Sequence, residues 1–199
     1  MMSEPKGKLI IISGPSGVGK TTVLRQLTAT CPLPLQESIS CTTRGRREGE
    51  TEGVSYHYLT DEQFQKHRAA DEFLECTEVF GRGHWYGTLK EPVTTGLNEG
   101  KWIILEIDVE GAVKVMPLYP EAISIFIHPG GIEELERRLR GRGTESEEAI
   151  KRRLEVASHE LEAAPSYTHI VTNHSVEQTV NDICQLLLNS GENSECTTN

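Results

Sequence analysis

The sequence predicts an α/β fold in which helices cover both faces of a parallel sheet. Short apolar runs rich in β-branched residues recur along the chain, as buried parallel strands do. Segments with helical spacing separate most of these runs, which indicates β-α-β crossovers. The chain has 199 residues, enough for one α/β domain with a substantial core.

Five runs are the expected strands of this sheet. They lie at residues 9–12, 35–40, 102–107, 123–127 and 169–172, of which 35–40 is the weakest. Two stretches interrupt the alternation: residues 41–96 are rich in arginine, tyrosine and glycine, and residues 131–164 are charged and helical. We interpret both as insertions into a core. The remaining segments are the core at 1–40, 97–130 and 165–189 and a frayed polar tail at 190–199.

The segment between the first strand and the first helix is glycine-rich and reads IISGPSGVGKTT. It matches the pattern G-x-x-x-x-G-K-[ST], the P-loop, whose backbone N–H groups surround a polyphosphate at a helix N-terminus. Lys20 would reach the β- and γ-phosphates, and the Thr21 hydroxyl would ligate Mg²⁺. A glycine-rich turn without a ligand is the alternative, against which strand, loop and helix agree. The predicted nucleoside triphosphate site comprises Gly14, Pro15, Ser16, Gly17, Val18, Gly19, Lys20, Thr21 and Thr22.

The strand run at 102–107 continues into LEIDVEG, where Asp108 has the place of a Walker-B carboxylate that helps to hold Mg²⁺. An ordinary turn residue is the alternative, because aspartate often follows a strand. Since the chain also carries a P-loop, we favour the functional interpretation. Glu106 would point to the opposite face from Ile107 and could line the same cleft.

The first insertion contains an arginine cluster in SCTTRGRREGETEGVSYHY. Arg44, Arg46 and Arg47 lie close together in an otherwise acidic chain, and Tyr56 and Tyr58 follow them. Arginine forks match phosphate oxygens two at a time, and tyrosine hydroxyls add neutral donors. A solvated charge run balanced by neighbouring glutamates is the alternative. Beside a triphosphate site, the cluster indicates a phosphate-bearing acceptor.

The second insertion carries further arginines. Arg138 and Arg142 are four residues apart, so a continuing helix would place both on one face. Thr144 with Glu147 forms a capping box that starts the next helix and brings Arg153 back. A salt-bridged surface helix is the alternative, because several glutamates are within reach.

The net charge and the cysteine content argue against several classes of function and partner. The formal net charge of −10 argues against a nucleic-acid coat or an anionic membrane surface as partner. The 5 cysteines lack C-x-x-C spacing and are expected to be reduced thiols. No apolar run approaches membrane-spanning length, and MMSEPKGK lacks the apolar segment of a signal peptide. We expect a cytoplasmic protein, monomeric or homodimeric, without nucleic-acid or membrane partners.

Several motifs in this order resemble guanylate kinases. They are SGPSGVGKTT, SCTTRGRREGETEGVSYHY, FLE…WYGT, LEIDVEGA, RLRGRGTESEEAIKRRL and VTN, and they extend from about residue 9 to 188. The resemblance implies a P-loop NTPase core of three α/β/α layers, with 41–96 as a GMP-binding insertion and 131–164 as a mobile helical lid. It also implies the activity of that family, phosphorylation of GMP by ATP to give GDP and ADP.

By matching position, the resemblance implies site residues. The GMP site would comprise Ser40, Arg44, Arg47, Glu50, Tyr56, Glu75, Tyr86, Gly87, Thr88 and Asp108. The catalytic residues would be Lys20, Arg138, Arg142 and Arg153. Asn173 would lie near the adenine of ATP, with a loop-and-cap role as the alternative. Thr21 and Asp108 would hold the Mg²⁺ that accompanies ATP.

Glu75 would read the guanine, helped by the Ser40 and Thr88 hydroxyls. Guanine offers N–H donors at N1 and N2 side by side, so one carboxylate can accept both. Adenine presents a bare acceptor at N1, and a site built for one pattern rejects the other by roughly 10⁴–10⁵. An ordinary exposed glutamate is the alternative for Glu75.

The chain departs from the usual family pattern at several positions. The loop in CTEVFGRGHW is longer than usual, which could shift Tyr86 or bring Arg82 or His84 near the GMP phosphate. Unusual residues also stand at Glu106, Glu110 and His174. Two rivals remain: an interaction module that no longer catalyses, and a kinase with another acceptor such as a ribose phosphate. The intact P-loop and GMP-site residues argue against both.

Overall fold

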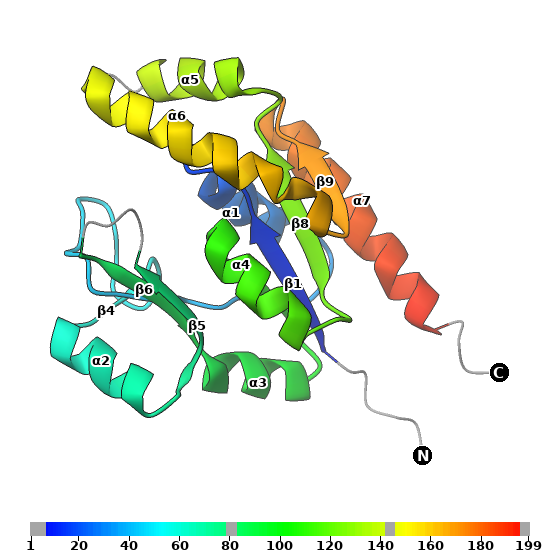
Figure 1. Ribbon diagram of the computed structural model, residues 1–199. Coiled ribbons are helices and arrows are strands. Elements are labelled where there is room, and N and C mark those ends of the chain that lie inside the picture. Colours follow the sequence, from blue (N-terminus) through cyan, green and yellow to red (C-terminus); the bar gives the residue numbers. More distant parts are fainter. Residues whose placement is uncertain (1–6, 79–82, 142–145, 196–199) are drawn as a thin grey trace. The chain divides into compact units, whose positions relative to one another are not determined.

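The computed structural model of the protein describes residues 7–78, 83–141 and 146–195 (Figure 1). The chain divides into two compact units. Unit 1 comprises Met1–Ile11 and Gln36–Ile123, and unit 2 comprises Ile12–Leu35 and Ser124–Asn199. The first strand, β1 (Lys8–Ser13), belongs to both, because the division falls between Ile11 and Ile12.

In unit 1, strands β2, β7 and β1 of the central parallel sheet are hydrogen-bonded in that order. β2 spans Leu35–Glu37 and β7 spans Trp102–Glu106. The β7 side chains are buried as far as Leu105, which is why this continuous apolar run forms a strand covered on both faces. The turn after β7 starts α4 (Val109–Val115), whose N-cap is Asp108.

Unit 1 also contains a second, smaller sheet in the order β4-β3-β6-β5. Its strands are β3 (Cys41–Thr42), β4 (His57–Tyr58), β5 (Phe73–Glu78) and β6 (Trp85–Leu89). β6 pairs antiparallel with β3 and β5. Its core is an aromatic cluster in which Phe64 of α2 (Asp61–Ala69) stacks on Phe73 with ring centroids 4.4 Å apart. The helix α3 (Lys90–Asn98) follows β6, and a short 3-10 helix, η2 (Met116–Leu118), follows α4.

In unit 2, the order continues from β1 to β8 (Ile123–His128) and β9 (His169–Thr172). β8 and β9 are parallel, with Ile125 opposite His169. The helices of this unit are α1 (Lys20–Thr30), α5 (Ile132–Gly141), α6 (Glu147–Glu162), η3 (Ala164–Ser166) and α7 (Val176–Glu195). The helical spacing of Val23, Leu24 and Leu27 gives α1 its buried face.

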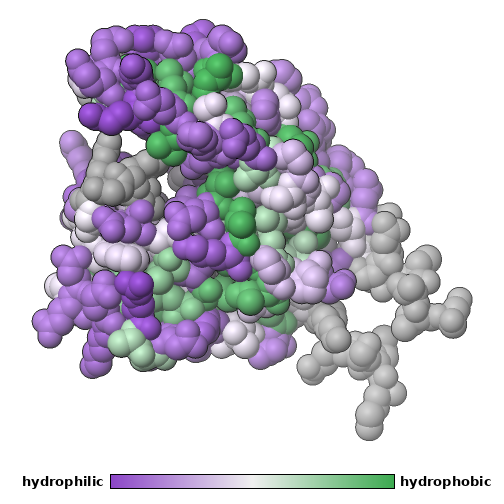
Figure 2. All heavy atoms as spheres, viewed as in Figure 1, coloured by the Kyte–Doolittle hydropathy of each residue, from purple (hydrophilic) through white to green (hydrophobic). Residues whose placement is uncertain are grey.

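Helices α5 and α6 share a small core of Leu135, Leu139, Ile150 and Ala157. Their outer surface is mostly hydrophilic (Figure 2). The N-cap of α6 is Ser146, whose Oγ accepts from the Ala149 N–H at 3.3 Å. The prediction that Thr144 caps this helix was wrong, and Thr144 itself lies outside the described residues.

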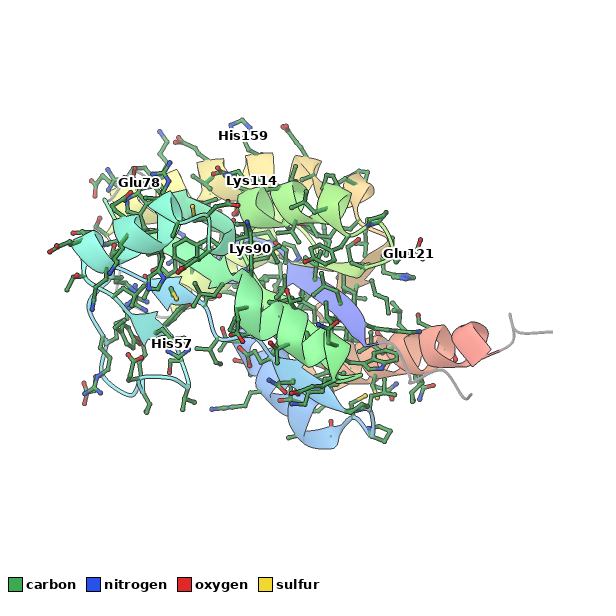
Figure 3. The ribbon with its side chains drawn as sticks, turned by 90° about the horizontal axis from the view of Figure 1, so that it is seen from below. His57, Glu78, Lys90, Lys114, Glu121 and His159 are labelled. Carbon is green, nitrogen blue, oxygen red and sulfur yellow. The ribbon has the colours of Figure 1, made fainter. Side chains whose placement is uncertain are left out.

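Several ion pairs lie on the surface of the protein. Lys90 pairs with Asp71 and Lys114 pairs with Glu110, and the N–O distance is 2.7 Å in each pair (Figure 3 labels both lysines). Such pairs contribute little to stability because water screens them. The described part of the chain contains no helix long and apolar enough to cross a membrane.

All five expected strands are confirmed, although β2 ends at Glu37 and not near residue 40. The α/β fold with a parallel central sheet is therefore confirmed. The last helix continues to Glu195, into the segment that the sequence suggested as a frayed tail.

Candidate active site

The P-loop of unit 2 needs glycine at two of its positions. Gly14 has φ of 145°, and a Cβ there would lie 2.4 Å from the Ile127 carbonyl oxygen. Gly19 has φ of 100° and is the N-cap of α1. Both conformations favour glycine, and the first also brings backbone close to backbone. The glycines of the motif are thus explained by the path of the loop.

The Lys20 side chain folds back over this loop. Its Nζ donates to the carbonyl oxygens of Gly14 at 2.6 Å and Pro15 at 3.3 Å. Lys20 is also the first residue of α1, so the ammonium group and the positive end of the helix dipole are on the same loop. This arrangement suits a polyphosphate, whose oxygens could replace the two carbonyls as acceptors.

Two of the predicted lid arginines contact the P-loop within unit 2. Arg138 donates from its terminal nitrogens to the carbonyl oxygens of Val18 at 3.2 Å and Asn173 at 2.5 Å. Arg153 donates to the Ser16 hydroxyl at 2.8 Å. The structure therefore brings these arginines to the loop that the sequence assigned to phosphate. Arg142 lies outside the described residues.

One of these arginines, Arg138, also supports the alternative of a salt-bridged helix, together with its neighbour Arg137. Arg138 Nε donates to Glu134 at 2.7 Å, and Arg137 contacts the same carboxylate at 2.7 Å. The hydrogen bonds from these arginines lower the pKa of Glu134 to about 2. Thus α5 carries both surface ion pairs and one arginine that reaches the loop.

Asn173 is buried, and both ends of its amide are used within the protein. Its Nδ2 donates to the Val18 carbonyl at 2.7 Å, and its Oδ1 accepts from the Thr179 hydroxyl at 3.0 Å. Ser175 precedes α7, and its Oγ accepts from the Gln178 N–H at 3.2 Å; the sequence suggested a capping box of these two residues, but the Gln178 side chain donates to Asp182 at 2.7 Å. These contacts give Asn173 a structural part in holding the P-loop. Its contact with adenine stays a prediction.

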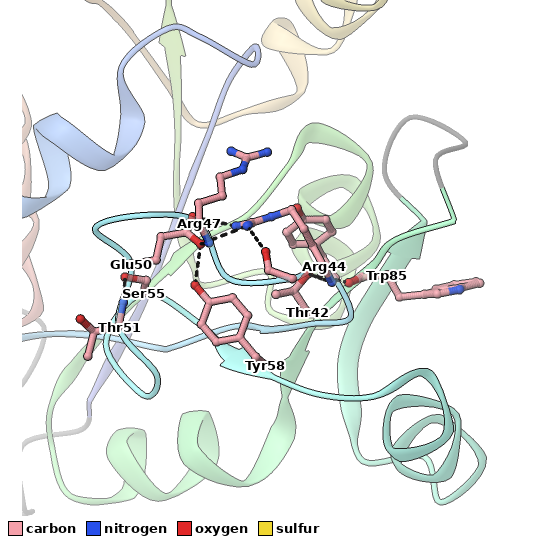
Figure 4. Close-up of polar contacts among 10 residues, drawn as sticks. Thr42, Arg44, Arg47, Glu50, Thr51, Ser55, Tyr58 and Trp85 are labelled. Carbon is pink, nitrogen blue, oxygen red and sulfur yellow. Dashed lines mark hydrogen bonds and ion pairs between the residues drawn. The ribbon is translucent and has the colours of Figure 1, made fainter.

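Unit 1 holds the arginine cluster that the sequence assigned to an acceptor phosphate (Figure 4). Arg44 is only 9% exposed and forms a two-pronged contact with Glu50, at 3.0 and 2.7 Å. Its Nε donates to the Tyr86 hydroxyl at 3.0 Å. Because Glu50 and Tyr86 accept hydrogen bonds from two edges of the planar Arg44 guanidinium, its orientation is fixed.

Glu50 is the centre of this network. Besides Arg44 it accepts from the Arg47 N–H at 2.8 Å and from the Tyr58 hydroxyl at 2.7 Å. The hydrogen bond from Arg44 holds the pKa of Glu50 at about 2, well below its usual range, so the carboxylate stays ionised. Glu50 therefore orients Arg44, and Tyr58 in turn orients Glu50. The Arg47 side chain is exposed.

Tyr56 and Tyr86 complete the cluster. Their rings meet edge to face with centroids 5.7 Å apart, and the Arg44 guanidinium lies 5.4 Å from the Tyr56 ring. Burial and the negative charge of Glu106 raise the pKa of Tyr56 to about 12, so its hydroxyl remains a donor. The longer loop has not displaced Tyr86 from Arg44. His84 is exposed, and Arg82 lies outside the described residues.

The residues predicted to read guanine form a second group in unit 1. Glu75 is 8% exposed, and its Oε1 accepts from the Thr88 hydroxyl at 2.8 Å. Burial raises the pKa of Glu75 to about 7; the Thr88 hydrogen bond opposes the rise, and the charge of Asp108 adds to it. The alternative of an exposed glutamate is thereby excluded. Ser40 is half-buried.

Asp108 lies beside Glu75, with both carboxylate oxygens engaged. Oδ1 accepts from the Gly111 N–H at 2.6 Å, and Oδ2 accepts from the Thr77 hydroxyl at 2.9 Å. The first contact makes Asp108 the N-cap of α4, which agrees with the alternative interpretation of Asp108 as a turn residue after the strand. The two interpretations are compatible, because each carboxylate oxygen can accept more than one hydrogen bond.

The donor set fits Mg²⁺ only with help from a substrate. The described residues contain no group of three or more His, Cys, Asp or Glu side chains able to hold a metal ion. Thr21, in the first turn of α1, and Asp108 offer hard oxygen ligands. Mg²⁺ is usually held by one or two such groups together with substrate phosphates and water. Thr21 in unit 2 and Asp108 in unit 1 each offer one ligand of this type.

The sequence analysis did not identify Thr77 and Glu37 as contributors, and it noted Tyr58 beside the arginines without its contact with Glu50. Thr77 contacts Asp108, Tyr58 contacts Glu50, and Glu37 shares its surroundings with Glu106. Burial and the charge of Glu106 raise the pKa of Glu37 to about 7. Thr77 had a detectable signal, because alternation along a strand places it on the same face as Glu75.

Comparisons with known proteins identify the family. The family model described as guanylate kinase matches residues 6–190. The chain belongs to the guanylate kinase family. A guanylate kinase of Rhodopirellula baltica is 51% identical over 195 residues, which cover 97% of this chain and 93% of that protein. One of Carboxydothermus hydrogenoformans is 44% identical over 178 residues, 89% of this chain and 86% of that protein.

The fold agrees with this membership. The crystal structure of guanylate kinase from Anaplasma phagocytophilum is similar, with a TM-score of 0.77 and 29% sequence identity, and the match covers 94% of this chain and 87% of that one. As a member of the guanylate kinase family, the protein is a kinase, an enzyme that transfers a phosphoryl group.

Proposed function

We propose that the protein phosphorylates GMP with ATP, giving GDP and ADP, and that dGMP is a second acceptor. The observation that carries this proposal is the buried carboxylate of Glu75, held by Thr88. It lies in the same unit as the Arg44 cluster. A base-reading carboxylate and a phosphate-binding arginine in one unit suit a purine monophosphate. No residue is assigned to the ribose 2′-hydroxyl, and we therefore include dGMP.

Glu75 supplies the selectivity for guanine. Its ionised form would accept from N1–H and one N2–H of guanine, which lie side by side. Adenine would place a lone pair against the carboxylate and leave it unpaired in a buried site, which is costly. The residues that would hold the GMP phosphate are Arg44, Arg47, Tyr56 and Tyr86.

For the transfer step we propose in-line attack by a GMP phosphate oxygen on the γ-phosphorus of ATP, without a phosphoenzyme. The acceptor phosphate has a second pKa of about 6 and is largely ionised near neutral pH, so a general base is unnecessary. Lys20, Arg138, Arg142 and Arg153 would offset the charge on the transferred group. A captured phosphoenzyme would contradict this step.

Mg²⁺ would be held by Thr21 and Asp108 together with ATP oxygens, and it would neutralise charge on the phosphates. Residues 131–164 would act as a lid over the triphosphate, and residues 41–96 as the GMP-binding insertion. Closure would exclude water and limit ATP hydrolysis. We also propose a cytoplasmic location, where GMP phosphorylation serves purine metabolism; the lack of C-x-x-C spacing among the cysteines supports it.

The test is a coupled ADP-release assay with ATP and Mg²⁺. GMP, dGMP, AMP and ribose 5-phosphate are compared in wild type, in Glu75→Ala and in Glu121→Ala. Glu121 is an exposed glutamate of the same unit and serves as the matched control (Figure 3). We expect rapid release with GMP and dGMP, little with AMP, and loss only in Glu75→Ala. Nucleotide binding without release would instead support the interaction module, and release with ribose 5-phosphate alone the sugar phosphate kinase.

A further inference from the structure

Two carboxylates lie together in unit 1, and each is held by one threonine hydroxyl. Glu75 accepts from Thr88 at 2.8 Å, and Asp108 accepts from Thr77 at 2.9 Å. Glu75 and Thr77 are two residues apart on β5, so both side chains are on the same face of the strand. Thr77 is 3% exposed, so its hydroxyl has little access to water as an alternative partner.

Gly111 shows how closely the two carboxylates approach. A Cβ at this position would lie 2.9 Å from Glu75 Oε2 and 3.1 Å from Asp108 Oδ1. The Glu75 and Asp108 side chains therefore both pack against the Cα of Gly111, in the first turn of α4. Two acceptor groups converging in this way match a ligand edge that carries more than two N–H donors.

Guanine has such an edge. N1 carries one N–H and the exocyclic amine carries two. A single carboxylate can accept N1–H and one hydrogen of the amine, which leaves the second amine hydrogen to another acceptor. Asp108 is the available acceptor next to Glu75. Asp108 can accept this hydrogen bond only in one orientation, because a rotated carboxylate would not present a lone pair to the amine.

We propose that Thr77 is a specificity-determining positioning residue that orients Asp108 toward the 2-amino group of the purine. The Gly111 N–H holds Oδ1 and the Thr77 hydroxyl holds Oδ2, so the plane of the carboxylate is fixed at both ends. Hypoxanthine has the same N1–H as guanine but no 2-amino group. Thr77 therefore contributes to the choice of GMP over IMP. This inference rests on the proposed function.

The experiment measures kcat and KM for GMP and IMP at saturating ATP in wild type, Thr77→Val and Thr77→Ser. Valine keeps the shape of threonine without the hydroxyl, and serine keeps the hydroxyl. Thr94→Val is the matched control, because that hydroxyl on α3 is exposed and donates to the Lys90 carbonyl at 2.8 Å, within its own helix. We expect Thr77→Val to lower kcat/KM for GMP about fivefold more than that for IMP, through KM, because any effect of Asp108 on Mg²⁺ is common to both substrates. The GMP/IMP ratio falls accordingly, and Thr77→Ser restores it.

Equal losses with GMP and IMP, or an unchanged ratio in Thr77→Val, would overturn the inference, because a merely structural threonine affects both substrates alike. If Thr77→Val fails to fold by circular dichroism, Thr77→Ala is compared with Thr77→Ser by the same ratio. Failure of the proposed function is a separate result, since wild type itself would then not phosphorylate GMP.

Discussion

The two units hold their charged site residues in different ways. In unit 1 the charged groups are held by other side chains: Arg44 by Glu50 and Tyr86, and Glu75 by Thr88. In unit 2 two cations, Lys20 and Arg138, donate to backbone carbonyl oxygens. Lys20 donates to the Gly14 carbonyl, and Arg138 donates to the carbonyl oxygens of Val18 and Asn173 as well as to Glu134.

This difference indicates a division of labour. Side chains fixed by side chains present a particular pattern of donors and acceptors, which can select one base. A loop of backbone N–H groups with nearby cations recognises phosphate, whatever base is attached. Substitutions in unit 2 should therefore lower turnover with every acceptor, whereas substitutions in unit 1 should change which acceptor is used.

The largest expected effect is that of Lys20→Met. Removing the ammonium that would neutralise the transferred group should lower kcat about 10³-fold, and equally for GMP and dGMP. Lys151→Met, on the exposed face of α6, is the control and should match wild type. Steady-state assays with both acceptors check this. A loss of kcat with only one of the two acceptors would contradict the division of labour between unit 1 and unit 2.

Glu75→Gln should raise KM for GMP about 100-fold while KM for ATP stays within error. The glutamine amide would face the guanine donors with a donor of its own, and the charge-assisted hydrogen bonds would be lost. Titration of GMP and ATP by calorimetry measures the two affinities separately. An equal weakening of both would show that the division of labour is wrong.

Wild-type KM for GMP should be about tenfold higher at pH 6 than at pH 8, because only ionised Glu75 accepts from guanine. Its pKa of about 7 places the change in this window, with binding strengthened as pH rises. The phosphate of GMP also titrates, with a pKa of about 6. Glu75→Gln retains only that second dependence, so the difference between the two profiles isolates Glu75. Identical profiles would contradict the assignment.

Tyr58→Phe should give the smallest effect, a rise of about threefold in KM for GMP. The phenol donates to Glu50 at 2.7 Å, so its loss would loosen Arg44 only indirectly. Tyr119→Phe, in the same unit but outside the cluster, should leave KM unchanged. A change in KM for ATP would mean that the two units do not act separately.

The sequence predicted the central sheet well because its strands are continuous apolar runs. Trp102–Leu105 and Ile125–Ile127 are buried as their composition implies. The start of α6 was misplaced because two residues close together, Thr144 and Ser146, both have the chemistry of an N-cap. Local propensity alone does not choose between such neighbours.

In the candidate site, motif spacing located the P-loop, the arginine cluster pointed to Arg44, and the family resemblance supplied Glu75, but none of these revealed the groups that orient them. Thr77 and Asp108 are 31 positions apart, and their hydrogen bond depends on how β5 meets α4. Tyr58 was noticed only as a neighbour of the arginines, since nothing local reveals that it holds Glu50. Residues that act through another residue leave little trace in a linear pattern.

The burial of Glu75, together with the nearby charge of Asp108, has a consequence for thermal stability. An acid whose pKa is raised by folding binds a proton more tightly in the native than in the unfolded chain, so its contribution to stability falls as pH rises from about 4.5 to about 7. At neutral pH the folded chain therefore keeps a buried charge that works against folding. Glu75→Gln should melt at a higher temperature than wild type. Such a result would show that the carboxylate that selects the base lowers the thermal stability of the protein.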